Sequence, residues 1–233
     1  MATRPNVNGG TGPSAGPLEG IAVESTGQYA YAVNIGDQTV SEYAVQPNGT
    51  LATNGTLPLP SNPDISAVSQ IAITLWDKKP CAYAPDGGLA VLYEMAIDPS
   101  TGTLSYVGNV AALNDAYGIA VHPNQKFIYV TASTVNAAVV SPMILVYAPS
   151  FDQKVPSCAV ALTSEVSVPV NSEPLGIAVE PTGQYAYVAN IGNGTVGEFS
   201  IDSATGALTP IGQVDSETPA NPQSQPFCAV TTH

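Results

Sequence analysis

Acidic and amide side chains stand at repeated places in this sequence, and they are the groups best suited to chemistry. Carboxylate and amide oxygens suit a hard cation such as Ca²⁺, and they also suit the hydroxyl groups of a sugar. The alternative interpretation is that Asn and Asp occur here because turns favour them. The candidate ligand-binding residues are Glu19, Asn34, Asp37, Asp115, Tyr117, Glu173, Asn190 and Asn193.

Hydrolysis is a reaction that such carboxylates could serve. It needs water activated by a base or a metal, and a donor that stabilises the oxyanion. A phosphorylated substrate also needs a cation for its phosphate, and arginine binds phosphate best. The chain has one arginine, Arg4, and two histidines, His122 and His233, none of which is expected beside the candidate residues. The residues expected for hydrolysis of a phosphorylated substrate are therefore missing or misplaced, and the catalytic residues stay unassigned.

The elements that must position these residues are copies of a segment about 50 residues long. "GIAVESTGQYAYAVNIGDQTV" at 20–40 and "GIAVEPTGQYAYVANIGNGTV" at 176–196 share 16 of 21 positions. Weaker copies begin at Gln70 and Gly118, and a fragment begins at Phe227. Repetition at this period is typical of repeat architectures in which each unit packs on the next.

Each copy divides into four short runs of β-type composition separated by turn residues, and no stretch has sustained helical periodicity. The sequence therefore predicts an all-β fold, a β-propeller built from four-stranded antiparallel blades. The first run of each copy is made of small residues, because the inner strands crowd around the axis. The predicted limits are a flexible arm at 1–16, blades at 17–62, 63–112, 113–170 and 171–215, and an extra inner strand at 226–232. In such a ring the candidate residues would share one rim, with His122 on the opposite rim.

Three short motifs carry a resemblance to a known family. "YAVN" at 31–34, "YVTA" at 129–132 and "YVAN" at 187–190 each follow "GIAV" and a turn with Gly or Asn. They resemble the YVTN repeats of the lactonase-type propellers, the family that contains 6-phosphogluconolactonase-like enzymes. The resemblance spans roughly 17–233 and implies the propeller fold, with lactone hydrolysis as the family's activity. Because the cation that a phosphorylated lactone needs is missing beside the candidate residues, we expect no phospholactonase activity.

The number of blades departs from that family, whose members are usually seven-bladed. Four copies and one extra strand do not obviously close a ring, and an open propeller exposes a blade face and an unpaired edge. The chain is then part of a longer protein, or its ring is small or strained, or copies associate through their first and last blades into a larger ring. We expect association or a fragment in preference to a sealed monomer.

The composition restricts the partners and the location. A net charge of −13 disfavours nucleic acid, because affinity for that backbone comes from Lys and Arg. No apolar stretch reaches the roughly 18 residues that cross a bilayer, so no membrane insertion is expected. The start lacks a signal peptide, yet few charges with many Thr, Asn, Gly and Pro resemble an exported protein whose leader has been removed. We expect a secreted or periplasmic bacterial protein.

Two smaller features stay open at this stage. The cysteines permit one disulfide and one free thiol, or they are three buried apolar groups. Trp76 with Lys78 and Lys79 could contact a ligand, but a solvated turn beside one buried ring is the favoured interpretation. The three cysteines are Cys81, Cys158 and Cys228.

The function favoured by these features is an extracellular binding or assembly module. Its partners would be further copies of itself, or a protein or carbohydrate ligand. The alternative is a lactone or sugar hydrolase that uses the rim carboxylates, with Ca²⁺ as the one cofactor considered. A third interpretation is a piece of a larger enzyme whose catalytic blades lie elsewhere. Whether the chain is an enzyme stays undecided.

Overall fold

The fold is known from a computed structural model that describes residues 18–60, 67–136, 139–150, 158–169 and 172–216. All regular structure in these ranges is β, and sixteen strands form four antiparallel sheets of four. The prediction of an all-β propeller is confirmed. The described ranges contain no helix that is long and apolar enough to cross a membrane.

Each sheet is one blade, and its strands pair in the order in which they follow in the chain. The first blade holds β1 (Leu18–Val23), β2 (Tyr29–Asn34), β3 (Thr39–Val45) and β4 (Leu51–Pro58). The second holds β5 (Ala72–Trp76), β6 (Lys79–Asp86), β7 (Val91–Ile97) and β8 (Leu104–Ala111). The third holds β9 (Ile119–Val121), β10 (Ile128–Asn136), β11 (Val139–Pro149) and β12 (Val160–Ser167). The fourth holds β13 (Pro174–Val179), β14 (Tyr185–Asn190), β15 (Thr195–Ile201) and β16 (Leu208–Asp215). The predicted arm at 1–16 and the extra strand at 226–232 lie outside the described residues.

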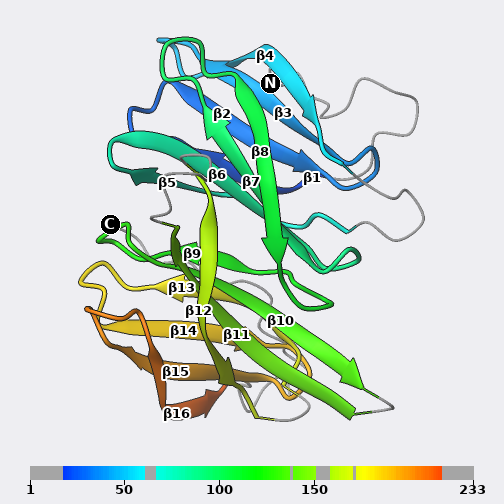
Figure 1. The fold of residues 1–233 in the computed structure, drawn as a ribbon, viewed down its shortest axis with the longest axis vertical. Helices are drawn as coiled ribbons and strands as arrows, with labels where there is room; N and C mark the ends of the chain where they lie inside the picture. Colours follow the sequence, from blue (N-terminus) through cyan, green and yellow to red (C-terminus); the bar gives the residue numbers. More distant parts are fainter. Residues whose placement is uncertain (1–17, 61–66, 137–138, 151–157, 170–171, 217–233) are drawn as a thin grey trace, which may run out of the picture.

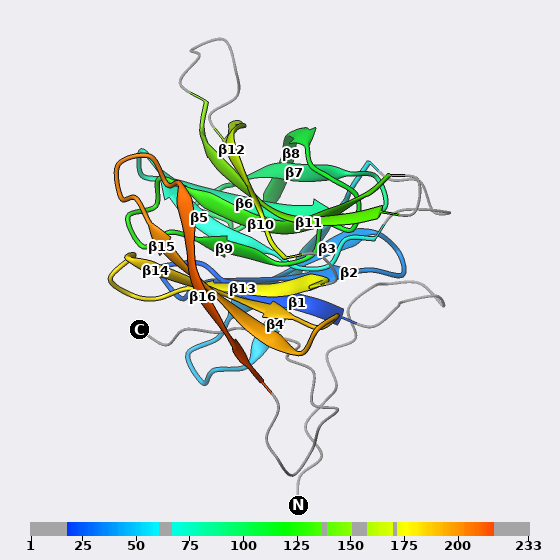
Figure 2. The same ribbon diagram turned by 90° about the horizontal axis from the view of Figure 1, so that it is seen from below.

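The blades follow one another around an arc. The inner strands β1, β5, β9 and β13 are neighbours in that order, and the first and fourth blades lie at opposite ends of the longest axis (Figure 1). In the view from below, along the longest axis, the first and fourth blades overlap on one side and the second and third blades on the other (Figure 2). Among the described strands, extended contacts join the first blade to the second, the second to the third, and the third to the fourth. The first and the fourth blade therefore each keep one face that no described blade covers.

The strand register makes the blades directly comparable. In every blade an alanine of the inner strand lies opposite a tyrosine of the second strand. This small-against-large pairing lets the inner strands approach the axis. It also sets the equivalence between blades that the following comparisons use. The pairs are Ala22–Tyr31, Ala72–Tyr83, Ala120–Tyr129 and Ala178–Tyr187.

The paired tyrosine forms a hydrogen bond to the next blade at two of the three junctions. The hydroxyl of Tyr31 donates to the carbonyl of Gly102 at 2.8 Å, and that of Tyr83 donates to the carbonyl of Cys158 at 2.6 Å. At the third junction the hydroxyl of Tyr129 has no partner among the described residues. There His122 provides a polar contact, since its Nε2 lies 2.9 Å from the carbonyl of Gly183. His122 thus belongs to a blade junction.

A buried glutamate of the third strand makes a second contact at the first two junctions. Glu42 Oε1 accepts the N–H of Leu104 at 2.8 Å, and Glu94 Oε1 accepts the N–H of Val160 at 2.7 Å. A hydrogen bond from the next blade satisfies each carboxylate, as a buried polar group requires. Gly108, opposite Glu94 on the neighbouring strand, leaves room for that side chain to lie across the sheet.

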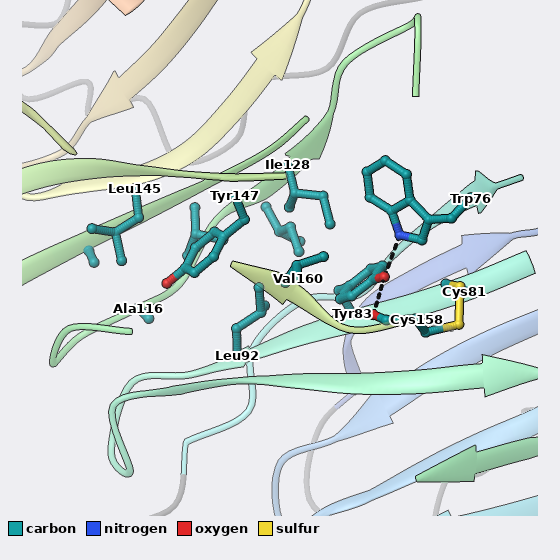
Figure 3. Packing of buried hydrophobic residues seen from close by; sticks show 13 residues of the cluster. Trp76, Cys81, Tyr83, Leu92, Ala116, Ile128, Leu145, Tyr147, Cys158 and Val160 are labelled. Carbon is teal, nitrogen blue, oxygen red and sulfur yellow. Dashed lines mark hydrogen bonds between the residues drawn. A yellow bond between two sulfur atoms is a disulfide. The ribbon is translucent and has the colours of Figure 1, made fainter. Parts of the chain in front are cut away.

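A third kind of contact between blades differs at the junction of the second and third blades from its equivalents at the other two junctions. Tyr29 packs on Gly102, and Phe127 packs on Gly206, with a turn glycine at positive φ in both cases. At the junction of the second and third blades the same two positions hold Cys81 and Cys158, which form a disulfide with a Cα–Cα distance of 5.7 Å (Figure 3). The disulfide therefore replaces an aromatic-on-glycine contact. Cys228 lies outside the described residues.

Trp76 belongs to the same buried cluster. Its Nε1 donates to the hydroxyl of Tyr83, and the two rings meet edge to face (Figure 3). Lys78 and Lys79 are exposed, and Asp77 and Lys78 both have positive φ. The segment is thus a tight turn beside one buried ring, which agrees with the favoured interpretation.

The buried glutamates make the stability depend on pH. Burial raises the pKa of Glu42 above its ordinary value of 4.5, although the bond from Leu104 opposes the shift. The stabilisation from such a raised pKa is complete below pH 4.5 and is lost as the pH rises through the raised value. Glu42→Gln keeps an acceptor for Leu104 and removes the charge. We therefore expect chemical denaturation to show that the variant gains stability relative to the wild type between pH 4 and pH 8, and a constant difference would contradict this.

Candidate functional site

A cavity of about 550 Å³ lies where loops of all four blades meet. Its lining comes from segments that enter the inner strands and from segments that join the second and third strands, which is the rim expected from the sequence. Most of the lining is apolar, as is usual for a small-molecule site. We call it the rim pocket. Its described lining includes Ile35, Ser69, Gly87, Asp115, Tyr117, Ser133, Glu173, Leu175 and Ile191.

Two carboxylates of the rim pocket occupy equivalent positions in neighbouring blades. Asp115 lies three residues before Gly118, and Glu173 lies three residues before Gly176. Both have positive φ, 52° for Asp115 and 44° for Glu173, in the left-handed region that few non-glycine residues adopt. The third and fourth blades therefore each present one carboxylate at the same place on the rim.

Hydrogen bonds hold the loops that carry these carboxylates. Ser133 Oγ donates to Asp115 Oδ2 at 3.0 Å, and the N–H of Ile191 donates to the carbonyl of Glu173 at 3.2 Å. Thr131 Oγ1 donates to the carbonyl of Leu175 at 2.7 Å, which ties the third blade to the fourth beneath the pocket. The Glu173 side chain is exposed, and no hydrogen bond or ion pair joins it to another described residue. The Asp115 side chain is exposed as well, so both carboxylates can reach a ligand, and of the two only Asp115 also accepts a hydrogen bond from a described residue.

Four other candidate residues serve turns and strand ends. Asn34 Nδ2 donates to Thr39 Oγ1 at 2.8 Å, and that hydroxyl donates to Asp37 Oδ1 at 2.7 Å. In the fourth blade Asn190 and Asn193 form the same relay through Thr195, at 3.1 and 2.8 Å. Both relays pin the turn between the second and third strands.

Asn34 and Asn190 are fully buried, and the Oδ1 atom of each has no partner among the described residues. Of the remaining candidates, Tyr117 lines the rim pocket. Glu19 lies in β1, and its side chain is outside the description. The assignment of the eight residues to ligand binding stays a prediction.

Asp86 is a residue of this rim that the sequence reasoning missed. It is fully buried, and its Oδ1 accepts the N–H groups of Ala67, Gly88 and Leu89 at 2.8 to 3.0 Å. It thereby shapes two loops that line the pocket. The available signal was its position, because Asp86 stands in "APDGG" where Asn34 stands in "YAVN".

Metal binding has no group of ligands to support it in the described part of the chain. No three His, Cys, Asp or Glu side chains come together there as a metal site would require. The rim pocket is therefore interpreted without a metal ion, and Ca²⁺ stays a prediction. His122 lies at a blade junction, and Arg4 and His233 are outside the described residues.

The comparison with protein families adds an independent observation. The family described as "Lactonase, 7-bladed beta-propeller" matches residues 82–226, which is more than half of the chain. The chain belongs to this lactonase family. No curated protein sequence matches it. The resemblance inferred from the repeated motifs is therefore confirmed at the level of the family.

Solved structures agree with the fold of this lactonase-family chain. A candidate 6-phosphogluconolactonase from Bacteroides fragilis superposes with a TM-score of 0.70 at 18% identity, over 92% of this chain and 60% of its own. The periplasmic gluconolactonase of Pseudomonas aeruginosa gives 0.67 at 17% identity, over 86% and 54%. Hydrazine synthase of Kuenenia stuttgartiensis gives 0.61 at 16% identity, over 84% and 62%. The chain thus spans about 60% of these relatives, and at such identities the likeness concerns the fold.

Proposed function

We propose that this lactonase-family propeller binds a small uncharged polyol or lactone in the rim pocket. The observation that carries the proposal is the pair Asp115 and Glu173, which two neighbouring blades present at one position in a left-handed backbone conformation. Strain of this kind is concentrated at functional sites. Carboxylates accept hydrogen bonds from hydroxyl groups, and the apolar lining suits the carbon face of a sugar-like ring.

An uncharged ligand is favoured because the described lining of the rim pocket contains no Lys, Arg or His. A phosphate in this pocket would meet two carboxylates and no cation. The proposal also places the chain outside the cytoplasm. The disulfide Cys81–Cys158 supports this location, because disulfides persist in oxidising compartments. The periplasmic location stated for the Pseudomonas relative is consistent with it.

The experiment is calorimetric titration with glucono-lactone and with neutral sugars of similar size. Glu173→Gln and Asp115→Asn are each expected to weaken binding by about tenfold, since each removes a charged acceptor worth about 1.4 kcal/mol or more. Glu165→Gln, on the exposed face of β12, is the matched control and should bind as the wild type does. Chelators should leave the affinity unchanged. If neither pocket variant alters binding, or if no ligand of this class binds, the proposal is wrong.

Hydrolysis of a neutral lactone is the second candidate function, and membership of the family favours it. Glu173 would act as the base that takes a proton from water, because its exposed carboxylate faces the pocket and has no described partner. We expect 6-phosphogluconolactone not to be opened above its spontaneous rate, as followed by acid release at constant pH. Opening of a neutral lactone that Glu173→Gln abolishes would establish the enzyme, whereas rapid opening of the phosphorylated lactone would contradict the preference for neutral ligands.

A further inference from the structure

Two blade faces have no described blade as a neighbour, and large apolar side chains are exposed on both. On the first blade the exposed part is the inner strand and the turn before β4, since Ala30, Ala32 and Tyr43 on the same face are buried. Among the described residues seven large hydrophobic side chains are exposed, and five of them lie on these faces. We call the two surfaces the first-blade free face and the fourth-blade free face. The former carries Ile21 and Val23 with the turn residues Gly49 and Leu51, and the latter carries Tyr185, Tyr187, Glu198, Ile211 and Val214.

The first-blade free face repeats a surface that is covered elsewhere in the same chain. Ile21 and Val23 are 63% and 56% exposed, whereas their equivalents Ile177 and Val179 are 5% and 4% exposed. Ile177 and Val179 are buried because they pack on the third blade in one core cluster. The Ile and Val side chains of the same "GIAV" sequence are therefore buried in the fourth blade and exposed in the first.

The fourth-blade free face is equivalent to the face of the first blade that packs on the second blade. Tyr187 and Glu198 are the equivalents of Tyr31 and Glu42, which bond to the second blade. Neither Tyr187 nor Glu198 has such a bond among the described residues. Tyr185 is the equivalent of Tyr29, and it is 40% exposed.

The outer strand β16 continues this face. Ile211 and Val214 are 56% and 50% exposed, whereas their equivalents Val107 and Val110 in β8 are partly buried against the cluster between the second and third blades. From β14 to the outer strand β16, the fourth-blade free face therefore carries the residue types that other blades bury at a junction.

The first-blade free face has the turn geometry that receives an aromatic ring at the other junctions. The turn of the first blade places Gly49 two residues before Leu51, as Gly102 precedes Leu104 and Gly206 precedes Leu208. Gly49 has a φ of 79°, close to the 70° and 72° of its equivalents, and nothing lies within 4 Å of the place where a Cβ would stand on it. It can therefore receive a ring from outside, as Gly102 receives Tyr29.

We propose that the fourth-blade free face docks on the first-blade free face of a second copy of this chain, through the contacts that join its own blades. Tyr185 then packs on Gly49, the hydroxyl of Tyr187 donates to the Gly49 carbonyl, and Glu198 accepts the N–H of Leu51. The contact is heterologous, so it closes a ring or continues as an open chain. Two copies close a ring of eight blades, within the range of four to eight known for propellers.

The test measures the mass of the 233-residue chain in solution as a function of concentration, by sedimentation velocity. The wild type should associate reversibly to twice 23.8 kDa. Ile21→Lys on the first-blade free face and Ile211→Lys on the fourth-blade free face should each weaken association by about tenfold or more, because each buries a charge at the junction. Leu162→Lys, on the exposed side of β12, is the control and should associate as the wild type does.

Mixing the two variants tests whether the contact joins the first-blade free face of one copy to the fourth-blade free face of another. Each variant keeps one intact face, and the two intact faces are complementary, so the mixture should form a one-to-one complex that neither variant forms alone. Circular dichroism of both variants confirms that they remain folded. A wild type that stays monomeric at every concentration overturns the proposal. So does a mixture of folded variants that does not associate.

Discussion

Replacing Cys81 and Cys158 together with alanine is expected to lower the free energy of unfolding by about 4 kcal/mol, from the 77-residue separation that the disulfide closes. The bond also stands where the other two junctions have an aromatic ring on a glycine. The double variant therefore loses both the cross-link and the contact that the two sulfur atoms make at this point of the junction. Urea denaturation followed by circular dichroism measures the loss.

Reduction of the wild type supplies the control for this experiment. A thiol reductant should destabilise the wild type to a similar extent and leave the double variant unchanged, because that variant has no Cys81–Cys158 bond to reduce. If the wild type unfolds at the same urea concentration with and without reductant, the disulfide does not stabilise the junction and the account of it is wrong.

Gly118→Ala is expected to destabilise the protein by about 3 kcal/mol, the cost of overpacking a close contact. A Cβ on Gly118 would overlap the carbonyl oxygen of Leu175 in the next blade and would approach Thr131 Oγ1. These atoms cannot move easily, because Thr131 is hydrogen-bonded to both Gly118 and Leu175. Since Leu175 lines the rim pocket, the same substitution should also weaken ligand binding.

Gly212→Ala is the matched control for Gly118→Ala. A Cβ on Gly212 would meet only the Glu198 side chain within 4 Å, with Oε2 at 2.6 Å, and that side chain can move aside because no described hydrogen bond holds it. It should cost less than about 1 kcal/mol, because alanine also restricts the unfolded chain. Thermal or chemical denaturation compares the two variants, and equal losses would show that the approach of Leu175 to Gly118 is not the cause.

The repeat predicted the architecture because the repeated residues are set both by strand pairing within a blade and by the packing of each blade on the next. Tyrosines at 31, 83, 129 and 187 recur because every blade places a large ring opposite the alanine of its inner strand. Gly20 and Gly118 recur because the backbone of the next blade approaches each of them closely. A single sequence carries such information whenever the same packing problem is solved several times in one chain.

The candidate site could be predicted only in part, because residue type does not fix the direction of a side chain. Asp115 and Asn34 both lie at expected rim positions, but Asp115 lines the pocket and Asn34 is buried in a turn relay. The two residues lie in different segments, Asn34 at the end of β2 and Asp115 before β9, and the positive φ of Asp115 is not visible in the sequence. The choice of Cys158 as partner for Cys81 likewise depends on the packing of the second blade on the third.

The central claim is that the repeated residues make the contacts between successive blades. Tyr→Phe substitutions at equivalent positions test this claim most directly. Tyr31→Phe and Tyr83→Phe each remove a hydrogen bond to the next blade, and each should lower the unfolding free energy by about 1–2 kcal/mol. Tyr187→Phe removes no such bond within the described chain. Measured by urea denaturation at concentrations too low for association, it should cost less than about 0.5 kcal/mol, as a surface substitution does. Equal effects at all three positions would contradict the account.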